Sequence, residues 1–169
     1  MTKHKKHITI GFSKPKGLLK QPISCIIRAF EGSKYSHVYI KLKTTQLANP
    51  LYYHASGLSV KFMNEKTFNK KNKVVEEHMS DISCAKYYKT LDYAIEKVDT
   101  PYSFSQLFGI IIIRLASICG KKISNPFGKK GYICTELVGE ILKKIHGKKI
   151  EKELNSLTLK DIKKLIEKK

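Results

Sequence analysis

The sequence lacks tryptophan, and its aromatic residues amount to only 9% of the chain. Proteins that bind single-stranded nucleic acid stack the bases on aromatic side chains, so a stacking surface is not evident here. Acidic residues are scarce as well: 14 Asp and Glu stand against 33 Lys and Arg, and the formal net charge is +19. The basic residues are lysine throughout, apart from Arg28 and Arg114.

A net charge of +19 attracts anionic partners, such as nucleic acid or an anionic membrane. The lysines are scattered along the chain without a clear stripe, so they do not select one of these partners. The alternative interpretation is a solvated lysine surface whose charge serves solubility. The sequence does not decide between these interpretations.

The sequence also lacks the cysteine spacing and the apolar runs that mark several classes of protein. Its four cysteines, at positions 25, 84, 119 and 134, show no C-x-x-C pattern, so we expect no metal site. The N-terminus is basic but has no apolar run of signal-peptide length, because residues 8–12 are short and strand-like. We therefore expect no signal peptide and a reducing compartment.

The most apolar stretch, residues 107–116, falls well below the roughly 20 residues that a bilayer span requires. Arg114 also interrupts it, so no transmembrane segment is expected. A buried helix is the main interpretation of this stretch, and a membrane-dipping or acyl-binding helix is the alternative.

The length and the apolar pattern predict one α+β domain over residues 1–169, with an antiparallel sheet flanked by helices and lysine-rich termini that can fray. Alternating apolar residues predict the strands, with loops rich in lysine and asparagine between them. Apolar residues at helical spacing, with capping residues such as Ser83 and Thr158, predict the helices. The expected strands are 8–12, 36–42, 52–55, 58–63 and 73–79, and the expected helices are 22–30, one that Ser83 caps, 105–118, one that begins near Cys134, and one after Thr158.

Cys134 is predicted to lie in the first turn of an amphipathic helix, just after the glycine-bearing loop that ends at Gly131. The unpaired N–H groups and the helix dipole at that position favour a thiolate, which lowers the thiol pKa. The same N–H groups can stabilise an oxyanion. Taken alone, Cys134 is equally well interpreted as a small buried apolar side chain, which is what we expect of Cys25, Cys84 and Cys119.

His37 lies near the start of the strand-like run Ser36-His37-Val38-Tyr39-Ile40, and His54 precedes Ala55 in the next strand. An imidazole next to Cys134 in the fold would complete the activation of a thiol nucleophile. The pieces Ser36-His37-Val38, His54-Ala55, Thr100-Pro101-Tyr102 and Cys134-Thr135-Glu136-Leu137-Val138 occur in this order. The order and the motifs resemble the circularly permuted papain-like cysteine hydrolases of the NlpC/p60 superfamily, which include the YiiX-like and lecithin:retinol acyltransferase-like groups in bacteria and viruses.

The resemblance implies a circularly permuted papain-like fold in which Cys134 is the nucleophile at the start of a late helix. His37 would be the general base, and His54 would be the third residue that orients the His37 imidazole. An alternative for His54 is a structural histidine at a strand end. The implied activity is that of a peptidase or amidase that forms a thioester acyl-enzyme, without a cofactor, on a peptide or peptidoglycan-like substrate.

Two other functions remain open at this point. One is an acyltransferase or a lipid (thio)esterase of the same fold, which would act on an acyl-lipid. The other is a basic structural protein of a virion that associates with nucleic acid or membrane and retains the fold without catalysis. The expected location is cytoplasmic or virion-associated.

Overall fold

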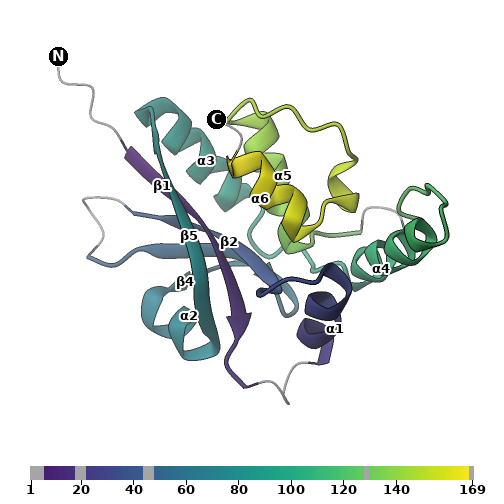
Figure 1. Ribbon diagram of the computed structural model, residues 1–169. Helices are drawn as coiled ribbons and strands as arrows, with labels where there is room; N and C mark the ends of the chain where they lie inside the picture. Colours follow the sequence, from purple (N-terminus) through teal and green to yellow (C-terminus); the bar gives the residue numbers. More distant parts are fainter. Residues whose placement is uncertain (1–5, 18–21, 44–47, 128–129, 168–169) are drawn as a thin grey trace.

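A computed structural model describes residues 6–17, 22–43, 48–127 and 130–167. The termini where we expected fraying, residues 1–5 and 168–169, lie outside the described residues, as do 18–21, 44–47 and 128–129. Five strands form one antiparallel sheet with the order β4-β3-β2-β1-β5 (Figure 1). The strands are β1 (Lys6–Pro15), β2 (His37–Leu42), β3 (Leu51–Ser56), β4 (Ser59–Asn64) and β5 (Asn72–Ile82).

Helices flank this antiparallel sheet, as the sequence predicts. Three of them, α3, α5 and α6, lie together on one side, and α2 lies on the other (Figure 1). The helices are α1 (Pro22–Glu31), α2 (Glu65–Lys71), α3 (Cys84–Glu96), α4 (Phe104–Ile118), α5 (Cys134–Lys144) and α6 (Leu159–Glu167), and a short 3₁₀ helix, η2, covers Leu154–Ser156.

The alternation of side chains along the strands separates two cores. Val38 and Ile40 of β2 belong to the large core, together with Leu137 and Ile141 of α5. Tyr39 lies between Val38 and Ile40 in the sequence and packs on the other face, because successive side chains of a strand point to opposite sides. There a smaller core contains Tyr39, Tyr52 and Phe68.

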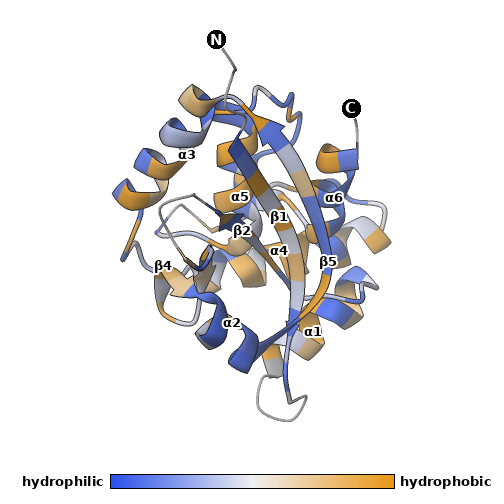
Figure 2. Cartoon of the chain, turned by 90° about the vertical axis from the view of Figure 1, so that its left-hand side faces the viewer, coloured by the Kyte–Doolittle hydropathy of each residue, from blue (hydrophilic) through white to orange (hydrophobic). Residues whose placement is uncertain are grey.

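The sequence predicts a loop over residues 64–72, and the structure forms helix α2 there instead. Its sequence has one buried apolar residue, Phe68, and a single residue produces no apolar periodicity. The helix starts through a local contact instead: the Asn64 side chain accepts a hydrogen bond of 2.8 Å from the N–H of Thr67. Figure 2 shows α2 largely in the colour of hydrophilic residues.

Helix α3 begins at the predicted cap, where the Ser83 hydroxyl accepts a hydrogen bond from the N–H of Lys86. Not all of its apolar residues face the core, since Ile95 is 58% exposed. Thr90 is buried instead, together with Tyr87 and Ala94. Burial of Thr90 is tolerated because its hydroxyl donates a 2.8 Å hydrogen bond to the carbonyl of Lys86.

Helix α4 occupies nearly the predicted residues, but the expectation that it is buried is wrong. Only Gln106, Gly109 and Ile110 are buried among its residues, and the helix extends outward at one end of the sheet (Figure 1). Its inner side is fastened by Asn125, which donates hydrogen bonds to the carbonyls of Gln106 at 3.0 Å and Asn155 at 2.9 Å. No helix among the described ranges is long and apolar enough to cross a membrane.

The terminal helix α6 starts at the predicted cap, Thr158, through a reciprocal pair of hydrogen bonds. The N–H of Thr158 donates to the Asp161 carboxylate at 3.0 Å, and the N–H of Asp161 donates to the Thr158 hydroxyl at 3.2 Å. The end of α1 joins this start, because the Glu31 carboxylate accepts a hydrogen bond of 3.0 Å from the N–H of Leu159. The fold thereby links α1, which precedes His37, to the C-terminal helix.

Candidate active site

The candidate site lies where β2 and β3 separate. The ladder between them runs from Leu42 opposite Leu51 to Ile40 opposite Tyr53 and stops there, although both strands continue. Beyond this point, Nε2 of His37 lies 2.9 Å from Nδ1 of His54, a hydrogen-bond distance. An imidazole pair thus connects the two strands where their backbone pairing has ended.

Cys134 lies against β2 on the face of the sheet that α3, α5 and α6 cover. It is the first residue of α5, and no side chain caps this helix start. The backbone N–H of Val38, the residue after His37, lies close enough to the thiol to lower its pKa, as do the N–H groups of Thr135 and Cys134 itself. The structure therefore brings the Cys134 thiol to the backbone of Val38 at the start of β2, one residue after His37.

The segment around Pro101 holds the start of α5 against the sheet. The N–H of Tyr102 donates to the carbonyl of Leu58 at 2.8 Å, and the N–H of Tyr132 donates to the carbonyl of Pro101 at 2.9 Å. At Gly131, a Cβ atom would lie 2.2 Å from the Pro101 carbonyl oxygen. This close approach requires glycine, because any larger residue would push the loop before Cys134 away from Tyr102.

Tyr132 further anchors this loop to the helix that follows it. Its hydroxyl donates a 2.7 Å hydrogen bond to the Glu140 carboxylate, which lies within α5. The hydroxyl groups of Tyr132 and Tyr93 are 3.3 Å apart, so α3 also contributes to this contact. The loop that precedes the thiol is thus held by the segment around Pro101 and by α3, both distant from it in the sequence.

A cleft of about 420 Å³ opens at this end of the sheet. His37, His54 and Tyr102 line it together with apolar residues of α1 and the first residue of α4, Phe104. Cys134 is only 7% exposed and does not itself line the cleft. Tyr102 connects the two, since it lines the cleft and lies within electrostatic range of the Cys134 thiol.

Burial overturns the expectation of an acidic thiol. It raises the pKa of Cys134 to about 11, and it outweighs the three backbone N–H groups that act in the opposite direction. Burial also lowers the pKa of His37 to about 4, and the charge of Lys61 contributes in the same direction. At neutral pH the resting site therefore holds a neutral thiol and a neutral imidazole.

His54 is fully enclosed. It is 1% exposed, its ring makes an edge contact with Phe68, and its Nε2 atom has no hydrogen-bond partner among the described residues. Burial lowers the pKa of His54 strongly, and the nearby His37 and Lys61 add to this effect. A neutral His54 can accept the Nε2–H of His37 through its Nδ1 atom, which leaves Nδ1 of His37 as the lone pair that can take a proton.

Two features of the site had no sequence signal. Lys61 lies opposite His54 in the pairing of β3 with β4 and lowers the pKa of both histidines, but one lysine among so many does not stand out. The hydroxyls of Ser24 and Ser36 lie 2.5 Å apart in the cleft wall and connect α1 to the residue before His37. Isolated serines of this kind carry no recognisable pattern.

The remaining cysteines differ partly from expectation. Cys25 and Cys84 are half-buried, whereas Cys119 is exposed at the end of α4, so its prediction as a buried side chain is wrong. Within the described ranges, no three His, Cys, Asp or Glu side chains form a group that could hold a metal ion.

No protein-family model matches the chain, and no curated protein matches it either.

Proposed function

We propose that this chain is a papain-like cysteine hydrolase of the circularly permuted type, which cleaves an amide or ester through a thioester acyl-enzyme. Two observations support the proposal: the thiol at an uncapped helix start lies against the backbone N–H of Val38, the residue after His37, and His37 and His54 are joined by a hydrogen bond of 2.9 Å. The histidine strand precedes the cysteine helix in the chain, which is the permuted order.

In the proposed reaction, Cys134 is the nucleophile and His37 is the general base. Nδ1 of His37 takes the thiol proton while Sγ attacks the substrate carbonyl, so no free thiolate needs to accumulate. The backbone N–H of Cys134 holds the oxyanion. His37 then returns the proton to the leaving amine or alcohol, and a thioester remains on Sγ. Water, deprotonated by His37, attacks the thioester to release the acid and restore the thiol.

His54 serves as the orienting residue in this proposal. By accepting the Nε2–H of His37, it fixes the tautomer in which Nδ1 is free to act as a base. It stabilises a protonated His37 less than a carboxylate would, because its own ring is neutral and Lys61 lies nearby. The arrangement therefore suits proton transfer during attack better than a resting ion pair.

The apolar part of the cleft supports a second candidate, an acyltransferase or lipid (thio)esterase with the same nucleophile. Ile23 and Ile27 of α1 and Phe104 of α4 line the cleft that contains His37. Apolar walls of this kind favour an acyl chain over a polar peptidoglycan fragment. The chemistry at Cys134 is the same in both candidates, and only the acyl group and the acceptor differ.

The test is a panel of electrophilic probes with peptidyl, muropeptide and acyl-lipid recognition groups, with the modified residue identified by mass spectrometry. We expect one class to modify Cys134 selectively, and the class names the substrate. His37→Ala should slow this modification at pH 7 by at least about tenfold, because the general base is lost. His54→Asn should retain part of the rate, since an amide oxygen still accepts the imidazole N–H.

Cys119 is the internal control, because an exposed thiol reacts without help from the site. Its rate should be the same in both histidine variants. If every probe modifies Cys119 before Cys134, and if His37→Ala changes neither rate, the hydrolase proposal fails. A basic structural protein that retains the fold without catalysis then becomes the better interpretation.

A further inference from the structure

Two neighbouring helices carry more than half of the exposed large apolar side chains that the structure describes. On α4 these side chains are unusually open to solvent for a stretch this apolar: Phe108 is 57% exposed and Ile118 is 74% exposed. The full set on the two helices is Ile23, Ile26 and Phe30 of α1, and Phe104, Phe108, Ile112, Leu115 and Ile118 of α4.

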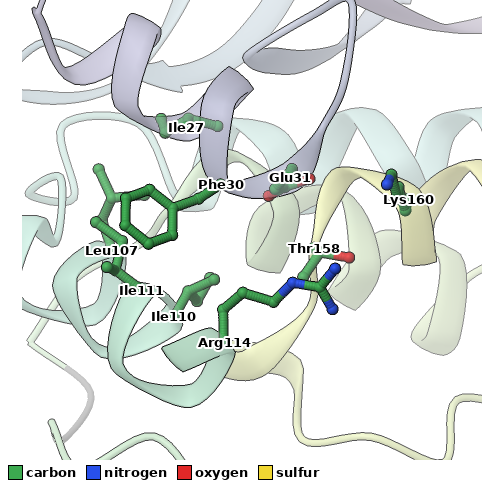
Figure 3. Close-up of a pocket in the computed structure, with 9 residues that line it drawn as sticks. All are labelled: Ile27, Phe30, Glu31, Leu107, Ile110, Ile111, Arg114, Thr158 and Lys160. Carbon is green, nitrogen blue, oxygen red and sulfur yellow. The ribbon is translucent and has the colours of Figure 1, made fainter. Parts of the chain in front are cut away.

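The two helices form one surface. A cavity of about 70 Å³ lies between them, where Phe30 of α1 meets Leu107 and Ile111 of α4 (Figure 3). Arg114 and Lys160 line the same cavity and place cations next to its apolar walls. We call the exposed apolar side chains of α1 and α4, together with this cavity, the α1–α4 face.

The charged residues of α4 and of the segment that follows it in the sequence are of one sign. Residues 104–130 contain no acidic residue, and their charged residues are Arg114, Lys121, Lys122, Lys129 and Lys130. Lys121 and Lys122 directly follow the end of α4 and are exposed. The acidic residue that lines the cavity, Glu31, already accepts a hydrogen bond from the N–H of Leu159.

We propose that the α1–α4 face docks on an anionic membrane, with its apolar side chains inserted at the boundary between lipid headgroups and acyl chains. Exposed Ile, Leu and Phe flanked by basic residues are what an interfacial helix requires. Arg114, Lys121 and Lys122 pair with anionic headgroups in this arrangement. The apolar face and the basic residues then act on the same partner.

Two other occupants fit the α1–α4 face less well. A second copy of the chain would bring two bodies of net charge +19 together, and their repulsion opposes association. Nucleic acid would engage the lysines, but aliphatic side chains have no partner on a phosphate backbone. The membrane is the partner that uses both the charge and the apolar side chains.

Docking in this orientation places the candidate cleft at the membrane surface. Ile27 lines both the cavity of the α1–α4 face and the cleft that contains His37, so the two features share a wall. Membrane binding does not depend on the thiol chemistry, and its test is independent of the hydrolase proposal.

The absence of native tryptophan allows a direct test. Ile112→Trp places one fluorescent reporter on the α1–α4 face, and Ile95→Trp is the matched control on α3, where the side chain is similarly exposed (58% against 41%). Both proteins are mixed with phosphatidylcholine vesicles that contain about one third phosphatidylserine. We expect a blue shift and quenching by brominated lipid at position 112 and neither at position 95. Equal responses at both positions, or none, overturn the proposal.

Charge and partner are tested with the same reporter. Combining Lys121→Glu and Lys122→Glu should lower the partition into these vesicles by at least about tenfold, and added salt should weaken the partition of the parent reporter protein. Cys134→Ser should partition like the parent, which separates failure of docking from failure of the hydrolase. A blue shift that depends on protein concentration without vesicles, or one that duplex DNA produces, assigns the α1–α4 face to self-association or to nucleic acid and overturns membrane docking.

Discussion

The ionisation of Cys134 is the property on which the proposed mechanism depends most directly. Burial raises the thiol pKa from 9.0 to about 11, which corresponds to about 3 kcal/mol against the thiolate. At pH 7 about one molecule in ten thousand then carries the thiolate, and at pH 10 about one in ten does. A papain-like ion pair with His37 would instead hold the thiolate at neutral pH.

The assay is the difference in ultraviolet thiolate absorbance between the parent protein and Cys134→Ser, titrated from pH 5 to pH 10. The substitution removes one thiol and leaves Cys25, Cys84 and Cys119 in both samples, so their signals cancel. We expect no difference signal at pH 7 and a signal that is still rising at pH 10. Iodoacetamide at pH 7 should accordingly label the exposed Cys119 before Cys134.

A difference signal that reaches a plateau below pH 8 would refute this reasoning. It would mean that attraction between the thiolate and a protonated His37 exceeds the combined effect of burial on both groups. In that case His37→Ala should abolish the plateau, because the counter-charge is gone. Without the plateau, His37 acts as a neutral base that takes the proton only during attack.

Further predictions concern stability and the supports of the site. Burial raises the pKa of Glu31 from 4.5 to about 7. Its contribution to the free energy of unfolding is therefore fully present below pH 4.5 and is lost as the pH rises through 7, by about 3 kcal/mol at most. In urea unfolding, Glu31→Gln should therefore be more stable than the parent at pH 8 and no more stable at pH 4; equal gains at both pH values would contradict this assignment. Gly131→Ala should lower the free energy of unfolding by about 1–3 kcal/mol and slow probe modification of Cys134, because the new Cβ would lie 2.2 Å from the Pro101 carbonyl oxygen. Unchanged unfolding and unchanged labelling would show that the loop can move without loss of stability. Phe68→Ala should lower the free energy of unfolding by about 3–5 kcal/mol and the Tm by about 10 °C, because it removes a buried ring from the small core under α2. A loss below 1 kcal/mol would show that this core contributes little to stability.

Local patterns in the sequence were sufficient for most of the secondary structure. The antiparallel strands, the Ser83 cap and the reciprocal cap of Thr158 with Asp161 depend on neighbouring residues, and all are present in the fold. Two helices departed from expectation for opposite reasons. Helix α2 packs through a single buried side chain, so its sequence shows no helical periodicity of apolar residues. Helix α4 has a strong apolar pattern, but hydropathy alone does not reveal whether the remainder of the chain covers it.

The candidate site, too, was only partly predictable from the sequence. Residue type and order along the chain singled out Cys134, His37 and His54, because a helix start and two successive strands are local features. The contact between His37 and His54 depends on where β2 and β3 stop pairing, and the position of Cys134 against β2 depends on Gly131 lying against Pro101. These are contacts between distant segments. The direction in which the pKa of the Cys134 thiol shifts could not be predicted from the sequence either. Helix geometry favours the thiolate locally, whereas the burial that opposes it is created only when the whole fold closes around Cys134.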